Sequence, residues 1–190
     1  MKMLYAIEEV VPHRQDMCLL ERITHWDQDT IEAELVVPEA GLFVENHEVP
    51  AWVGIEYMAQ AIAAWAGCRA RAAGKPPQLG FLLGSRRYNS ARCSFPSGSR
   101  LRVQARCELL GDNGLGMFAC RILAGEDEWA TANVSVFEPT DAMAYLESGQ
   151  HDRESKRAGD RRQPGHRPGH RAAHRARWLR RGGALPQPPG

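Results

Sequence analysis

The chain has 190 residues, of which 43% are hydrophobic and 25% are charged, so it can bury one good core and still carry a tail. The formal net charge of +1 says nothing about partners, because arginine and histidine crowd into the last forty residues while the part before them is mildly acidic. The first residues, MKMLYAIEEVVPHR, meet Glu8 and Glu9 before an apolar run can form, which argues against a secretory signal peptide and predicts a cytoplasmic protein.

The predicted elements begin with two strands, residues 18–25 and 30–37, which form a hairpin because Asp27-Gln28-Asp29 between them is turn material. A loop over residues 38–49 leads to Pro50, which suits the first turn of a helix, and the helix runs to about Ala73. Four more strands follow, at residues 78–88, 100–109, 116–123 and 128–137. This order predicts an α+β fold in which an antiparallel sheet wraps around one long central helix.

The composition changes after about Leu146, so we predict a domain over residues 1–147 and a disordered tail over residues 148–190. The tail is rich in Arg, His, Pro and Gly and has no hydrophobic periodicity. A solvated tail and a basic arm for nucleic acid are two interpretations. A third is a frameshifted read into an adjacent gene, because a shifted frame with GC-rich codons resembles the start of a short-chain ketoreductase. The nucleotide sequence tests the third interpretation.

Cysteine usage predicts reduced thiols. The five cysteines are an odd number, lie far apart and include no C-x-x-C pair, which favours free thiols over disulfide bonds. No spacing among them matches a zinc site, so we expect no metal. They are Cys18, Cys68, Cys93, Cys107 and Cys120.

The predicted helix carries two polar residues in an otherwise apolar run. Its sequence, AWVGIEYMAQAIAAWAGCRA, is broken by Glu56 and Gln60, one helical turn apart. Burying a carboxylate costs several kcal/mol unless the group is paired or neutralised, so the pattern indicates either a chemical role or a hydrogen bond to Gln60 or the backbone. A membrane span needs a cleaner apolar run, so we expect a soluble helix.

Three segments of the chain resemble one family of enzymes. The first is residues 11–14 (VPHR), followed by residues 17–22 (MCLLER). The second is residues 49–60 (VPAWVGIEYMAQ), which aligns without gaps with the family's helix opening MPGVLxxEAxAQ and puts Glu56 on the catalytic acid. The third is residues 95–99 (FPSGS), similar to the family's xxPGDxL turn. The chain thus resembles the hotdog-fold 3-hydroxyacyl-acyl-carrier-protein dehydratases, and especially the predicted dehydratases of aryl-polyene gene clusters.

The resemblance implies a hotdog fold and dehydration of a 3-hydroxyacyl thioester held on the phosphopantetheine arm of acyl carrier protein, in fatty-acid or aryl-polyene assembly. A base takes the α-proton and an acid protonates the leaving hydroxyl. Glu56, in apolar surroundings that favour its protonated form, is the expected acid, and His47 is the expected base. No metal, organic cofactor, nucleic acid or membrane is expected. The expected substrate-binding residues are Ala51, Trp52, Gly54 and Gln60, with backbone N–H groups of residues 51–54 as an oxyanion site.

The base is the point at which this chain departs from the family pattern. The family's histidine lies in an HFPGxP loop, whereas this chain has only Asn46-His47-Glu48 before the helix, so His47 takes that role only with a shorter loop. His13 is the rival base, although a structural role at the entry to the first strand is the alternative interpretation.

Two other functions stay open at this point, an acyl thioesterase and a non-catalytic acyl-binding subunit. The resemblance implies either a homodimer or a heterodimer with another hotdog subunit, because this fold usually completes its acyl tunnel between subunits. Arg86 and Arg87 are candidates for contact with the phosphopantetheine phosphate or an acidic carrier protein, or they are simply solvated strand residues.

Overall fold

The computed structural model describes residues 4–13 and 17–139, which belong to one compact unit, Met1–Leu146. The predicted tail, residues 148–190, and its boundary lie outside the described residues. In chain order the elements are α1 (Ile7–Val10), β1 (Arg22–Trp26), β2 (Thr30–Val36), β3 (Glu48–Pro50), the 3-10 turn η2 (Ala51–Val53), α2 (Gly54–Ala72), β4 (Phe81–Ser90), β5 (Ser94–Pro96), β6 (Arg100–Leu110), β7 (Leu115–Ala124) and β8 (Asp127–Phe137).

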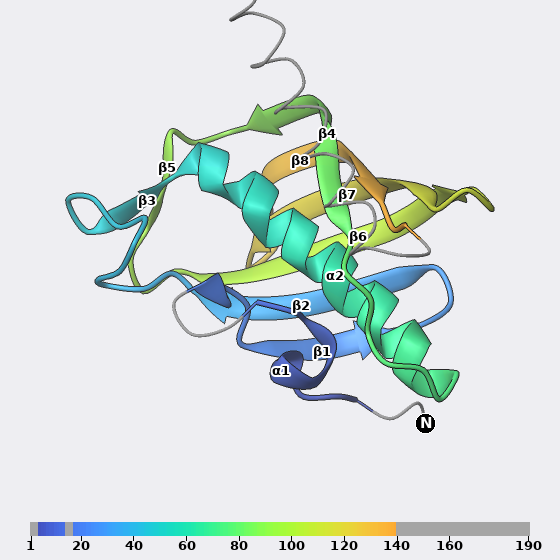
Figure 1. Ribbon diagram of the computed structural model, residues 1–190. Helices are drawn as coiled ribbons and strands as arrows, with labels where there is room; N and C mark the ends of the chain where they lie inside the picture. The colour runs from blue at the N-terminus through green and yellow to red at the C-terminus, as the bar shows by residue number, and fades with distance from the viewer. Residues whose placement is uncertain (1–3, 14–16, 140–190) are drawn as a thin grey trace, which may run out of the picture. The chain divides into compact units, whose positions relative to one another are not determined.

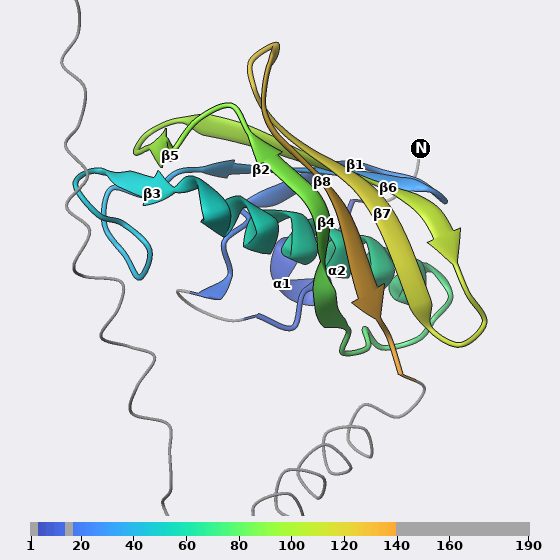
Figure 2. The same ribbon diagram turned by 90° about the horizontal axis from the view of Figure 1, so that it is seen from above.

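The main sheet has six antiparallel strands in the order β1-β2-β6-β7-β8-β4, and it curves around α2 (Figures 1 and 2). Alternate residues of each strand face the helix, as Ile31, Ala33 and Leu35 do in β2. The opposite side of β2 carries Thr30, Glu32 and Glu34 and lies on the outer face. This arrangement confirms the predicted α+β hotdog architecture, with one long helix inside a wrapped sheet.

Three short elements were not predicted from the sequence. Helix α1 has four residues, and β3 and β5 have three each, so none is long enough to show a period of its own. Strands β3 and β5 pair with each other, and their central residues, Val49 and Phe95, are fully buried. This small sheet holds the chain immediately before the long helix, and it therefore fixes where that helix begins.

The long helix packs its apolar side against the main sheet. Residues spaced along one side of α2, including Met58, Ala61 and Trp65, are at most 3% exposed. Trp65 meets Phe118 of β7 edge to face, with ring centroids 5.2 Å apart. In the part of the chain that the structure describes, no helix is long and apolar enough to cross a membrane.

The close approach of α1 to α2 depends on Gly67. A Cβ built at this position would overlap the backbone carbonyl oxygen of Val10, the last residue of α1. Because α1 leads directly to Pro12 and His13, this contact also fixes the position of the segment that follows it.

We therefore expect Gly67→Ala to destabilise the protein by about 1–3 kcal/mol, because the new methyl group forces α1 away from α2. The sign of the effect is diagnostic, since the same change inside an unobstructed helix stabilises by about 1 kcal/mol. Urea unfolding of both proteins measures it. A variant as stable as the wild type, or more stable, would show that the two helices do not touch at Gly67.

Candidate active site

The carboxylate of Glu56 lies in the first turn of α2 and contacts two side chains. Its Oε1 accepts a hydrogen bond of 3.0 Å from Gln60 Nε2, which is one of the interpretations that the sequence left open. The same oxygen lies 3.6 Å from Nε2 of His13. The side chains of His13 and Glu56 are 32% and 29% exposed, so Glu56 is less buried than the sequence predicts.

Gln60 is the buried polar residue of this site, with no exposed surface. Its Oε1 accepts a hydrogen bond of 2.9 Å from the backbone N–H of Leu19, and its Nε2 donates to the carbonyl of Met17 at 2.8 Å as well as to Glu56. These partners determine the orientation of the amide, because only Oε1 can accept from an N–H. Gln60 thus ties the chain before β1 to the helix and holds the carboxylate of Glu56.

A cavity of about 120 Å³ begins at His13 and Glu56 and continues between α2 and the ends of β4 and β8. Small and apolar side chains form most of its wall, which suits the hydrocarbon part of a ligand. The helix contributes Ala59, Ile62, Ala63 and Ala66, the segment before β4 and its first residues contribute Gln78, Gly80, Phe81 and Leu82, and the end of β8 contributes Val136, Phe137 and Glu138. The site therefore combines one acid and one imidazole with an apolar channel.

The predicted base, His47, does not line this cavity. Asn46 and His47 have φ angles of 51° and 60° and form the two-residue tip of a tight turn, in which Glu45 and Glu48 exchange backbone hydrogen bonds. The side chain of His47 is exposed. Within one chain, the structure brings His13 rather than His47 to Glu56.

The four predicted substrate-binding residues, Ala51, Trp52, Gly54 and Gln60, also lie outside the lining of the cavity. The N–H of Ala51 donates to the carbonyl of Cys93 at 2.9 Å, and the carbonyl of Ala51 accepts a hydrogen bond from the hydroxyl of Tyr88. Gly54 is buried and donates its N–H to Ala51. The ring of Trp52 is 62% exposed and meets Phe43 edge to face. Two of the four predicted oxyanion donors are thus already used in holding the start of the helix.

The pairing of His13 with Glu56 could not be read from spacing, because 43 residues separate them in the sequence. The only signal was the VPHR segment, which resembled the family's opening without indicating what its histidine contacts. Packing of α1 on α2 and the hydrogen bonds of Gln60 together bring the two residues into contact.

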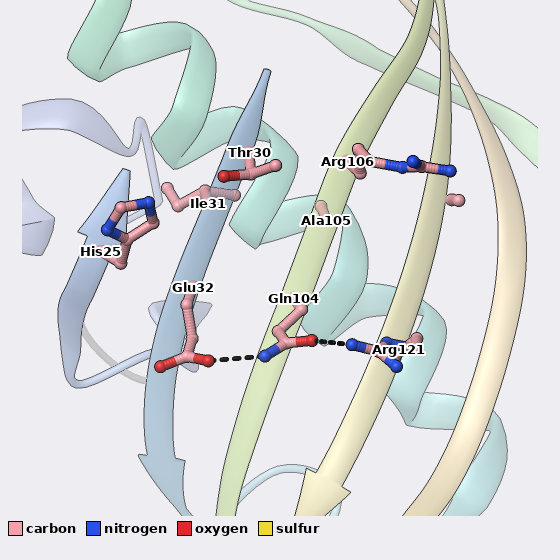
Figure 3. A pocket seen from close by; sticks show the side chains of 9 residues that line it. His25, Thr30, Ile31, Glu32, Gln104, Ala105, Arg106 and Arg121 are labelled. Carbon is pink, nitrogen blue, oxygen red and sulfur yellow. Dashed lines mark hydrogen bonds between the residues drawn. The ribbon is translucent and has the colours of Figure 1, made fainter. Parts of the chain in front are cut away.

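A larger cavity, of about 570 Å³, lies on the outer face of the sheet. Figure 3 shows Gln104 between Glu32 and Arg121, and it donates to the first and accepts from the second at 2.6 Å each. Burial raises the pKa of Glu32, but hydrogen bonds from Gln104 and Thr24 outweigh this and bring it below its ordinary value. An ionised carboxylate so engaged stabilises the sheet and is unsuited to donate a proton. We therefore place the chemistry at the smaller cavity.

The described residues include no group of three or more His, Cys, Asp or Glu side chains arranged to hold a metal ion. All five cysteines are free thiols, and Cys68 and Cys120 are buried. Burial raises the pKa of each of these two thiols to about 12, which makes them inert at neutral pH.

Comparison with known proteins identifies the family of this chain. Residues 5–147 match the family described as ApeP-like, ApeP dehydratase. No curated protein sequence matches significantly. Among solved structures, the dehydratase heterocomplex ApeI:P from Xenorhabdus doucetiae is similar with a TM-score of 0.70 and 26% identity, over 75% of this chain and 96% of that one.

Two more distant structures share the fold. The uncharacterized protein PH1136 from Pyrococcus horikoshii has a TM-score of 0.51 at 12% identity and covers 66% of this chain and 88% of its own. Cj0977 from Campylobacter jejuni has a TM-score of 0.50 at 13% identity and covers 71% and 88%. The family match spans most of the chain and includes both His13 and Glu56. It confirms the resemblance to hotdog dehydratases of aryl-polyene clusters, and the chain belongs to the ApeP-like dehydratase family.

Proposed function

We propose that this dehydratase acts on 3-hydroxyacyl thioesters carried by acyl carrier protein, in aryl-polyene or fatty-acid assembly, with His13 and Glu56 as its acid–base pair. The observation that carries the proposal is the 3.6 Å contact between these two side chains at the end of an apolar cavity. An acyl chain in that cavity has its reacting carbons next to both groups. The elimination needs one base and one acid, which the pair supplies without a metal or an organic cofactor.

The roles follow from the chemistry of each group. His13 takes the α-proton, the C2–H electron pair forms the 2,3 double bond, and the bond from C3 to the hydroxyl oxygen breaks as Glu56 delivers a proton to that oxygen. The products are a 2-enoyl thioester and water. Because Gln60 donates to Oε1 of Glu56, that oxygen serves as an acceptor, and the proton to be delivered resides on Oε2. Gln60 is then a positioning residue and does not touch the substrate.

The cavity within one chain is too small for a long acyl chain. Its volume is about 120 Å³, which supports a second subunit supplying the rest of the channel. One wall of the cavity is the beginning of β4, which is the last strand of the main sheet. We propose that this chain forms a heterodimer with another hotdog subunit, and its similarity to the dehydratase heterocomplex ApeI:P supports this. The cytoplasmic location stays a prediction.

Product analysis tests the proposed function. The full-length chain, alone and together with a second hotdog subunit from its own gene neighbourhood, is incubated with 3-hydroxyacyl carrier protein and followed by mass spectrometry. We expect a 2-enoyl thioester that is 18 mass units lighter by loss of water, with the acyl group still attached to the carrier. Release of free carrier thiol would instead indicate a thioesterase. No product under either condition would favour a non-catalytic acyl-binding subunit.

A further inference from the structure

The edge strand β4 combines an apolar part with a basic part. It pairs with β8 on one side only and ends the sheet, so its other edge is open within the described chain. At its start, Leu79, Leu82 and Leu83 are 40%, 42% and 54% exposed. Farther along, Arg86 and Arg87 are both exposed. A long open edge with exposed leucines is a surface on which another strand can be added.

Neither arginine has an acidic partner among the described residues. The arginine ion pairs among the described residues involve Arg22, Arg100, Arg102, Arg106 and Arg121, and none includes Arg86 or Arg87. Arg87 has a φ of 57°, and the pairing of β4 with β8 is irregular between Arg86 and Asn89. This bulge is held by Tyr88, whose hydroxyl donates to the carbonyl of Ala51. Arg87 therefore lies at an open edge with a strained backbone conformation, and the bulge changes the direction of the neighbouring side chains.

We propose that Arg86 and Arg87 select the partner of this edge: they disfavour a second copy of the chain and favour a hotdog subunit whose edge strand carries acidic residues at the facing positions. The inference rests on the heterodimer of the proposed function and deepens it by naming the residues that choose the partner. It does not depend on which reaction the site catalyses.

The geometry of strand addition gives the reason. If two copies of β4 pair antiparallel along their whole length, Arg86 of one chain stands opposite Ser85 of the other, and Arg87 of that other chain is the diagonal neighbour on the same face. Neighbouring strands lie about 4.8 Å apart, so one such pair of arginines meets on each face of the sheet beside the two-fold axis. Like charges at such positions destabilise pairing, whereas acidic residues at the same positions stabilise it. The exposed leucines favour association with any partner strand, whereas the arginines determine which partner strand is favoured.

A charge swap within this chain tests the proposal without the natural partner. In the full-length variant Arg86→Glu, Arg87→Glu the edge becomes acidic, so this variant alone should associate as poorly as the wild type. We expect an equimolar mixture of the two proteins to form a mixed dimer at least about tenfold more tightly than either protein alone. Sedimentation velocity in about 50 mM and about 500 mM NaCl should show opposite responses: salt weakens the mixed dimer and strengthens self-association of the wild type.

The matched control is Lys75→Glu, Arg106→Glu, which changes the net charge equally at two exposed positions outside β4. Its mixture with the wild type should associate no more than the wild type alone. The neutral variant Arg86→Gln, Arg87→Gln should self-associate more than the wild type, which provides a second reading if circular dichroism shows that the charge reversal unfolds the chain.

Two results would overturn the proposal. One is a wild-type dimer whose affinity responds neither to salt nor to these substitutions. The other is an unchanged association together with a raised KM for acyl carrier protein in the charge-reversed variant, which would assign the arginines to carrier binding. Loss of dehydration with intact mixed pairing would count against the proposed reaction and not against this inference.

Discussion

Glu56→Gln should lower the rate of dehydration by about 10³-fold, within the range expected for loss of a general acid. The amide keeps the volume of the side chain but cannot deliver a proton to the leaving hydroxyl. A 10³-fold loss corresponds to about 4 kcal/mol of transition-state stabilisation. Single-turnover kinetics on 3-hydroxyacyl carrier protein measure the chemical step, and thermal unfolding verifies that the fold is retained.

The matched control is Glu45→Gln, an exposed glutamate close to the start of the helix and outside the cavity. It should leave the rate within about twofold, since surface substitutions away from a site have small effects. If Glu56→Gln retained more than about a tenth of the wild-type rate, Glu56 would not be the acid. The pair formed by His13 and Glu56 would then have a structural role.

His13→Ala should lower the same rate by about 10²–10⁴-fold, whereas His47→Ala should leave it within about twofold. The reason is position: His13 Nε2 lies 3.6 Å from Glu56, and His47 is exposed at the tip of a turn outside the cavity. Both variants are assayed as full-length protein together with the partner subunit, so that a base supplied from a second chain is also detected.

The double variant His13→Ala, Glu56→Gln adds a further check. Residues that act in one step are not additive, so the double variant should be little slower than the slower single variant. The opposite ranking of the two histidines, with His47→Ala inactive and His13→Ala active, would show that the turn at Asn46 and His47 carries the base to a partner's glutamate. The family resemblance implied His47 as the base, and this comparison decides between the two.

The long elements of the fold were predictable because each has enough residues to show its own period. The predicted helix, from Pro50 to about Ala73, covers the turn η2 and helix α2, and four of the six predicted strands lie within about two residues of their observed bounds. The exceptions are the first strand, which begins at Arg22 and not at Cys18, and the third, which begins at Phe81 and not at Gln78. The residues before Arg22 are instead held by Gln60, a contact that no local pattern reveals.

The site was predictable only in part. Glu56 stood out because a carboxylate in an apolar helix requires a reason, and the structure supplies Gln60 and His13 as its neighbours. The base was assigned to His47 because the family resemblance places its histidine in the loop before the helix. Within one chain His47 does not line the cavity and is exposed at the tip of the tight turn.

The helix, the strands and the position of Glu56 could be read from the sequence, because they depend on hydrophobic period and on the cost of burying charge, which are local properties. Contacts in the folded chain were needed to show which histidine meets Glu56 and that Gln60 is the buried residue that holds it. They also show that β4 is an open edge where Arg86 and Arg87 have no acidic neighbour among the described residues. Those facts depend on contacts between segments far apart in the chain. Such contacts are set by the packing of α1 on α2 and by the order of strands, and neither leaves a periodic signal in the sequence.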